Sequence, residues 1–266
     1  MRLSEIWVYP VKSLRGYSVP STTLIEGGLA LDRRWMIVSE EGQFLTQRDL
    51  PQMVSLFAKF GVEDTLIISH RSGGRVEIDP LTDQSSLIYV QVWKDKCPAI
   101  PAPVAVNRQL SVWLGREVQL VTLISGQLRA VNPQYGHITD QVSFADGFPL
   151  LVTSVASINA LNHTMKYPIE MERMRANLII SDCEPYAEDS WQSVEINGIA
   201  IDLVKPCSRC IIPSINLQSG VSEPHVIRAL NESRRIGGSI FFGYNAIHRQ
   251  LGQLHVGAEV NVLAKR

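Results

Sequence analysis

The side chains with the clearest chemical potential in this chain are two cysteines, Cys207 and Cys210, which are separated by Ser208 and Arg209. Thiolates are ligands for soft metal ions, and a guanidinium makes paired hydrogen bonds to phosphate oxygens. A cation beside a thiol also favours the thiolate, which is the form that binds metals. The spacing therefore indicates a site for an anionic ligand that carries a metal.

A lone Cys-x-x-Cys pair is compatible with several kinds of site. A structural zinc ion needs two further ligands, but the sequence has no second pair of this kind and its six histidines are scattered. A thioredoxin-like dithiol lies at the start of a helix, whereas residues 211–215 have the pattern of a strand and a loop. Packing of both thiols in the core also remains open, because free cysteine is often a small buried hydrophobe.

The composition predicts a folded chain with a substantial core. Hydrophobic residues make up 45% of the 266 residues and charged residues 19%, which suits one large β domain or two packed lobes. The formal net charge of −1, without a basic stripe, argues against a protein that binds nucleic-acid polymers or membrane surfaces.

The cysteine content and the first residues favour a reducing compartment. Four cysteines are too few for a disulfide framework in a chain of this length. The first residues lead into an alternating pattern rather than the apolar core of a signal peptide. The longest apolar run, near residues 149–158, is too short to span a bilayer. We therefore expect a cytoplasmic protein with free thiols and no membrane segment.

Short strand-like runs dominate the sequence and predict a mostly β fold with a few helices, of the α+β class. Asn197-Gly198, between two such runs, is the strongest hairpin signal. Other strands are expected around residues 6–9, 34–38 and 65–68. The segment 94–103, with its three prolines, is expected to be an irregular connection.

Three stretches have the spacing of helices. Asn107 is a candidate N-cap for a helix that ends at Gly115. Ser154 is a candidate N-cap for a second helix, and Ser222-Glu223-Pro224 opens a third. A weak change of composition near residues 115–125 marks a boundary between two lobes.

Several short motifs occur in an order that resembles one known family. They are Tyr9-Pro10-Val11-Lys12-Ser13, Asp32-Arg33-Arg34-Trp35, Leu45-Thr46-Gln47-Arg48, Asp146-Gly147-Phe148-Pro149, Arg175-Ala176-Asn177, Tyr186-Ala187-Glu188-Asp189-Ser190-Trp191 and Cys207-Ser208-Arg209-Cys210. Over nearly the whole chain they resemble the MOSC-domain proteins, in particular the branch that contains the mitochondrial amidoxime-reducing component and its bacterial homologues.

The resemblance implies a MOSC β-barrel of the pyruvate-kinase-C-terminal-like type with an additional N-terminal MOSC region. We place the N-terminal region at residues 1–120 and the MOSC domain at residues 121–266. The N-terminal region is largely an insertion in relatives, so the resemblance implies that the first strand belongs to the barrel of the C-terminal half.

The resemblance also implies a molybdenum–molybdopterin cofactor whose metal is bound by one cysteine sulfur. The position that matches this catalytic metal ligand is Cys210, with Cys207 as a neighbour. Asp146, or a water near it, is the candidate proton donor. The positions that match cofactor contacts are Lys12, Ser13, Arg33, Gly147, Phe148, Arg175, Asn177, Ser208, Arg209 and Asn245.

The activity that the resemblance implies is reduction of N-hydroxylated compounds such as amidoximes, hydroxylamines and N-hydroxylated bases. Some bacterial relatives carry a plant-type ferredoxin domain, but this sequence ends at Arg266 without the cysteines of such a domain. We therefore expect electrons from a separate ferredoxin-like, flavin or b-type cytochrome protein.

Two alternatives to the reductase remain open. MOSC domains also occur in molybdenum-cofactor sulfurases, so one alternative is a carrier of the molybdenum cofactor or of a sulfur atom without its own turnover. A barrel that has lost its cofactor is the other alternative, because some relatives have small hydroxyl residues in place of Gly147 and Phe148 and tyrosine in place of Asn245. At Gly147 and Phe148 only the backbone would contact the cofactor. At position 245 the neighbouring Tyr244 would take the place of the tyrosine.

Overall fold

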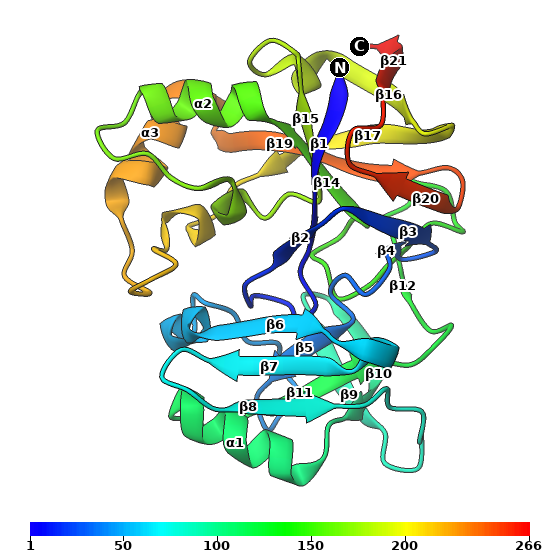
Figure 1. The fold of residues 1–266 in the computed structure, drawn as a ribbon, viewed down its shortest axis with the longest axis vertical. Helices are drawn as coiled ribbons and strands as arrows, with labels where there is room; N and C mark the ends of the chain where they lie inside the picture. The colour runs from blue at the N-terminus through cyan, green and yellow to red at the C-terminus, as the bar shows by residue number, and fades with distance from the viewer.

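The computed structural model describes residues 1–266, which fold into two lobes stacked along the long axis of the molecule (Figure 1). The upper lobe contains both chain termini, and the lower lobe is formed by the segment from β5 (Trp35–Val38) to β11 (Gln119–Leu123). The fold is mostly β with three α-helices, so the predicted α+β class is confirmed.

The upper lobe is a barrel that closes where its first and last strands meet. Its main sheet has the order β2-β1-β15-β14-β19-β17-β16-β21. Leu3 N donates to Ala258 O over 2.9 Å and Val260 N donates to Met1 O over 3.0 Å, which joins β1 to the start of β21. Pairing at this seam removes two exposed sheet edges. The first strand is therefore part of the barrel that the C-terminal half builds.

The strands of this sheet are β1 (Arg2–Val8), β2 (Tyr17–Val19), β14 (Leu150–Ser154), β15 (Leu178–Ser181), β16 (Trp191–Ile196), β17 (Ile199–Ser208), β19 (Ser239–His248) and β21 (Val260–Lys265), with β18 (Arg235–Ile236) paired to β19. Two small sheets lie outside it. They contain β3 (Ser21–Ile25), β4 (Gly28–Leu29) and β20 (Gly252–His255), and β12 (Arg129–Ala130) with β13 (Gln141–Val142).

The hairpin between β16 and β17 turns at the predicted pair. Asn197 and Gly198 both have positive φ, 54° and 75°, as a two-residue turn of the type I′ class requires. The hairpin is confirmed, and its second strand runs directly into the segment that contains the two cysteines.

The lower lobe has two sheets, of order β5-β11-β10-β9 and β6-β7-β8, and α1 (Val104–Leu114) packs against β11 and β8. Their remaining strands are β6 (Leu56–Phe60), β7 (Leu66–His70), β8 (Arg75–Ile78), β9 (Ile88–Val92) and β10 (Asp95–Pro101). Short 3₁₀ helices occur at η1 (Pro51–Ser55) and η2 (Val62–Asp64) here, and at η3 (Met171–Met174), η4 (Ala187–Ser190) and η5 (Ile212–Ser214) in the upper lobe.

The irregular connection predicted for residues 94–103 is wrong, because most of this segment is β10. The strand pairs with β9 from Asp95 to Ala99 and with β11 only from Ala99 to Pro101. Pro98, which cannot donate a backbone hydrogen bond, therefore lies where β10 is paired on one side only. The prolines of this segment are compatible with a strand because of where they fall in the ladder.

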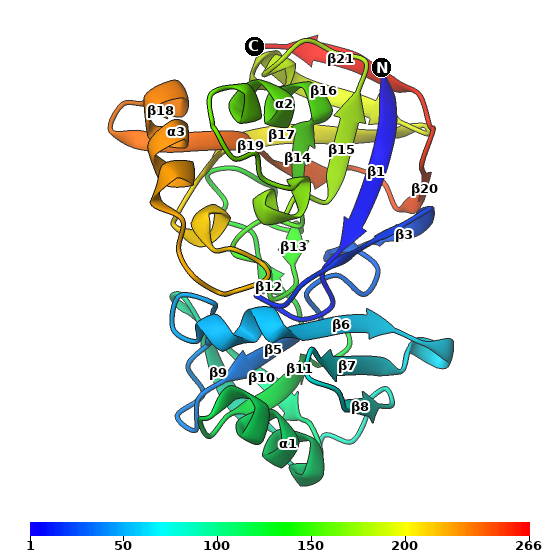
Figure 2. The same cartoon turned by 60° about the vertical axis from the view of Figure 1, so that its left-hand side comes forward.

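The helices α2 (Val155–His163) and α3 (Pro224–Arg234) pack together beside the barrel (Figure 2). The hydroxyl of Ser154 accepts from Ser157 N over 3.1 Å, so the predicted N-cap of α2 is confirmed. The start of α3 at the predicted proline is also confirmed.

The start predicted for α1 at Asn107 is wrong, although its end at Gly115, with φ of 66°, is confirmed. The helix begins three residues earlier, at Val104, without a side-chain cap. The amide of Asn107 instead donates to Ala102 O and accepts from Leu120 N, so it ties α1 to β11. A good capping residue is used here for a tertiary contact.

Each lobe has its own hydrophobic core, one inside the barrel and one between α1 and the lower sheets. The boundary predicted after residue 120 falls inside β11, whose partners β5 and β10 are both lower-lobe strands. None of the three α-helices is both long and apolar enough to cross a bilayer.

A buried carboxylate, Glu188, joins β14, α2 and η4. It is fully buried and accepts hydrogen bonds from the hydroxyls of Thr153, Ser154 and Ser157 over 2.9–3.1 Å. We predict that Glu188→Ala lowers the free energy of unfolding by about 3 kcal/mol, because buried hydroxyls lose their charged acceptor. Urea unfolding followed by circular dichroism measures the change.

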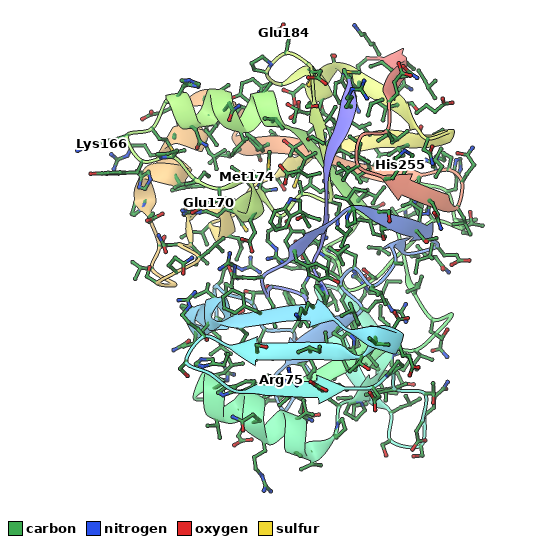
Figure 3. All side chains as sticks on the ribbon, in the orientation of Figure 1. Arg75, Lys166, Glu170, Met174, Glu184 and His255 are labelled. Carbon is green, nitrogen blue, oxygen red and sulfur yellow. The ribbon has the colours of Figure 1, made fainter.

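The matched control for this prediction is Glu184→Ala. Glu184 is exposed and lies at the outer end of the upper lobe (Figure 3). This control is expected to stay within about 0.5 kcal/mol of the wild type, as surface substitutions usually do. Equal effects of the two substitutions would contradict the role given to the buried carboxylate.

Candidate functional site

All the residues that the sequence predicts for the site line a single cavity of about 440 Å³. Both lobes contribute to its walls. The predicted residues are Lys12, Ser13, Arg33, Asp146, Gly147, Phe148, Arg175, Asn177, Ser208, Arg209, Cys210 and Asn245, and Cys207 lines the same cavity. Residues that are more than 200 positions apart in the sequence, such as Lys12 and Asn245, therefore line the same cavity.

Several lining residues are absent from the predicted set. Lys205 is two residues before Cys207, and Arg48 belongs to one of the family motifs, so both had a signal in the sequence. Trp93 had none, because it lies in the β9–β10 turn far from every motif. The acidic residues nearest to these motifs, Asp49 and Asp32, would be natural ion-pair partners for Arg48, but it pairs with neither.

Three lining residues have left-handed backbone conformations. Ser13, Arg33 and Arg175 have φ of 66°, 47° and 56°, although none is glycine. Such conformations are unfavourable for residues with a Cβ and are concentrated at functional sites. Here they turn the chain sharply at three points on the cavity wall.

Behind the cavity wall, the ring of Tyr9 contacts two guanidinium groups of lining residues. Arg33 is 4.2 Å and Arg175 is 4.5 Å from the ring centroid, and the ring is completely buried. Burial raises the pKa of the Tyr9 phenol, so the ring stays neutral. Its faces attract both cations, which otherwise repel each other.

Positive charge is concentrated around this ring. Burial and then the charge of Arg33 lower the pKa of Arg175 to about 10, so it remains charged at neutral pH at a cost in free energy. Arg33 is partly neutralised, because it donates to Asp32 over 2.6 Å and to the Arg175 carbonyl over 3.0 Å. An anion that binds beside Arg175 would relieve the remaining repulsion.

The ammonium of Lys12 also uses most of its hydrogen-bonding capacity within the protein. Its ammonium is buried and donates to Phe144 O over 2.9 Å and to Asp146 over 2.5 Å. Burial lowers the pKa of Lys12, and the charge of Asp146 partly reverses this effect. Lys12 and Arg33 therefore act mainly as positioned charges with few free donors.

The free donors belong to Arg209 and Arg175, which also line the cavity. The Nε of Arg209 is buried and has no hydrogen-bond partner, while its terminal nitrogens contact Met174 O at 2.8 Å and Cys207 Sγ at 3.3 Å. Arg175 makes one side-chain hydrogen bond, to Leu14 O. An orphaned buried donor costs about 1–3 kcal/mol, so this arrangement favours an anionic ligand that would accept from it.

The two thiols differ in their surroundings. Cys207 is half-buried at the end of β17 and contacts the Arg209 guanidinium, whereas Cys210 is exposed. The strand predicted within the strand-and-loop segment 211–215 is wrong, because residues 212–214 form η5. No three His, Cys, Asp or Glu side chains gather in the structure to form a metal cluster. One thiolate with open space in front of it suits a metal that arrives with other ligands.

Asp146, the candidate proton donor, lies against Lys12 and Trp93. Crowding by neighbouring atoms raises the pKa of this carboxyl, but the Lys12 ammonium and hydrogen bonds from Lys12 and Trp93 lower it by more, and it falls well below its usual range. The carboxylate is therefore ionised at neutral pH and has no proton to donate. Its role here is to accept from Lys12 and from the Trp93 indole, over 3.1 Å in the second case.

The remaining predicted residues contribute in different ways. The Asn177 side chain is buried and bonds to Leu151 N and Trp7 O, so it joins strands rather than pointing free donors into the cavity. Asn245 has no side-chain hydrogen bond and stays available. At Gly147 a Cβ would meet nothing within 4 Å, so the backbone there borders open space.

Comparisons with known proteins agree with this architecture. The profile of the MOSC N-terminal beta barrel domain matches residues 1–117, and that of the MOSC domain matches residues 139–261. Mitochondrial amidoxime-reducing component 1 of Mus musculus is 29% identical over 83% of this chain and 67% of its own length. The Homo sapiens protein of the same name is 26% identical over 99% of this chain and 83% of its own length.

A further relative is a much longer protein. The molybdenum cofactor sulfurase of Oryza sativa subsp. japonica is 29% identical over 91% of this chain. The chain spans only 32% of the length of that sulfurase. The two profile matches follow one another along the chain and together contain every motif described above. The chain belongs to the family of proteins that combine a MOSC N-terminal domain with a MOSC domain.

Proposed function

We propose that this protein is a molybdenum-cofactor-dependent oxidoreductase that reduces N-hydroxylated compounds, namely amidoximes, hydroxylamines and N-hydroxylated bases. The observation that carries the proposal is the exposed thiol of Cys210 in a cavity whose unsatisfied donors include the buried Nε of Arg209. The relatives named amidoxime-reducing components support the reaction class.

The residues present fit molybdopterin with its metal. Its phosphate carries a charge of about −2, which the unpaired cations Arg175 and Arg209 would balance. The hydroxyls of Ser13 and Ser208 and the amide of Asn245 add donors in the same cavity. The Cys210 thiolate would be the protein ligand of the metal. When bound, the cofactor supplies the two-electron chemistry that cleaves an N–O bond.

The side chains around the site orient the ligand and set the local field. The Tyr9 ring contacts both Arg33 and Arg175, and Asp146 accepts a hydrogen bond from Lys12. These positive charges lower the free energy of negative charge that develops at a leaving oxygen. Conversion of N–OH to N–H consumes two electrons and two protons and releases water. Because Asp146 is ionised, we assign proton delivery to solvent in the cavity.

Electrons are proposed to come from a separate redox protein of the ferredoxin-like, flavin or b-type cytochrome kind. Transient docking of such a protein suits a site that opens to solvent beside an exposed Cys210. We also propose a cytoplasmic location, since all four cysteines are free thiols.

A carrier of the molybdenum cofactor or of sulfur is the second candidate. The sulfurase relative and the contact between Cys207 and Arg209 favour it, because a cation beside a thiol would stabilise a persulfide anion. Such a protein would hold the same cofactor without turnover.

Metal analysis combined with an activity assay tests the proposed function. We expect holoprotein from cells that synthesise the cofactor to contain about one molybdenum per chain and to reduce benzamidoxime with reduced viologen as the electron source. Molybdenum without turnover would favour the carrier, and absence of both would favour a barrel without a cofactor.

Substitution of each thiol separates their roles. We predict that Cys210→Ser abolishes benzamidoxime reduction, because a hard oxygen replaces a soft sulfur at the metal. Cys207→Ser is the matched control. Its turnover is expected to fall at most about threefold, since Cys207 contacts Arg209 and is not the proposed metal ligand. X-ray absorption of the two variants measures the metal ligands directly. Equal loss of activity in both would indicate a dithiol mechanism instead.

Because Lys12 and Asp146 form an ion pair in the site, we expect retention of the molybdenum cofactor to depend on pH. Asp146 raises the pKa of Lys12 against the larger lowering by burial, so Asp146→Asn lowers the Lys12 pKa further. Lys12 then loses its proton at a lower pH, so the net charge of the site falls by one over a lower pH range than in the wild type. We predict that the midpoint of the alkaline change in molybdenum retention moves to lower pH in this variant, as measured from neutral pH up to about pH 10.4, the ordinary pKa of lysine.

The same variant tests whether Asp146 takes part in proton delivery. Because its carboxylate has no proton to give, turnover of Asp146→Asn at pH 7 is expected to fall by no more than about tenfold when corrected for molybdenum content. Complete loss of turnover with full molybdenum would restore Asp146 as a proton donor.

A further inference from the structure

One wall of the cavity is aromatic and comes from the lower lobe. Trp93, in the β9–β10 turn, lies against Phe44 with ring centroids 5.0 Å apart. The guanidinium of Arg48 lies 5.3 Å from the Trp93 ring centroid. Trp93 and Arg48 both line the cavity that contains Cys210. We call this pair the Trp93–Arg48 wall.

The wall is held in place but not covered. The Trp93 indole donates to Asp146 over 3.1 Å, its carbonyl accepts from the Gln91 side chain over 2.9 Å, and its backbone has φ of 55°. Trp93 nevertheless remains 45% exposed. A bulky residue is rarely found with positive φ, so the fold accepts strain to present this ring at the site.

The guanidinium of Arg48 has unused hydrogen-bond donors. Its Nε donates to Thr46 Oγ1 over 3.2 Å, and that hydroxyl is in turn fixed by Asp49 over 2.8 Å. Neither terminal nitrogen of Arg48 has a hydrogen-bond partner, and no carboxylate pairs with it. A flat guanidinium on a flat indole offers a planar surface with hydrogen-bond donors at its edge.

These features fit neither a core-packing role for Trp93 nor a phosphate-binding role for Arg48. A tryptophan that only packs the core would be buried, as Trp35 is at 4% exposure. Arg209, which contacts Cys207, and the unpaired Arg175 belong to the barrel half and are sufficient to balance a phosphate. The Trp93–Arg48 wall is therefore left for the part of the cavity that receives substrate.

We propose that the Trp93–Arg48 wall stacks the ring of the substrate, so that the enzyme prefers planar conjugated N-hydroxylated compounds over aliphatic ones. This inference rests on the proposed function and adds the substrate class to it. Stacking on an aromatic wall improves binding of a ring about tenfold, whereas a methyl group in the same place gains little.

The test compares an aromatic amidoxime with an aliphatic one in molybdenum-loaded protein. In Trp93→Ala we expect kcat/KM with reduced viologen to fall about tenfold for benzamidoxime and less than about twofold for acetamidoxime. Trp93→Phe keeps a flat ring but loses the hydrogen bond to Asp146, and it is expected to retain the preference for benzamidoxime. Titration calorimetry of benzamidoxime without an electron donor measures the same tenfold weakening in Trp93→Ala by binding alone.

Several outcomes overturn the inference. Equal losses for both amidoximes would do so, as would failure of Trp93→Phe to a similar extent as Trp93→Ala, which would make the indole only a support for Asp146. Loss of molybdenum from Trp93→Ala would assign the wall to the cofactor. If the wild type reduces neither amidoxime, the proposed function fails, while the calorimetric comparison still decides whether Trp93 binds the ring.

Discussion

The structure around the cavity depends on keeping two like charges, Arg33 and Arg175, within one small space. The ring of Tyr9 contacts both cations, and Asp32 neutralises one of them. Neither contact removes the excess of positive charge. The site is therefore built for an anion, and its free energy is lowest when one is bound.

This requirement explains why the cavity draws on both lobes. The barrel supplies the thiols, Arg175 and Arg209, which the ends of β15 and β17 and the neighbouring turns hold in place. Lys12 and Arg33 come from the connections that lead out of the barrel, and the lower lobe adds Arg48 and Trp93 as a cover. A barrel alone would leave these charges in water, where their attraction for a ligand is screened.

The cations of the cavity divide into two groups with different consequences. Lys12 and Arg33 are paired with Asp146 and Asp32, so they contribute field and position. Arg175, Arg209 and Arg48 form no ion pair and retain unused donors, so they are the groups that can recognise ligands. The proposed division of labour follows from this pairing: barrel cations for a phosphate, and the Trp93–Arg48 wall for substrate.

The sequence by itself determined the mostly β class, the Asn197-Gly198 hairpin and the cap at Ser154. Such features depend on residues close in the chain, so their pattern is visible without the fold. Only the tertiary structure decided that most of residues 94–103 form a strand, that Asp146 is held ionised by Lys12, and that Trp93 lines the cavity with the two cysteines. The last two depend on partners more than 50 residues away, whose distances and charges act only once the chain has folded.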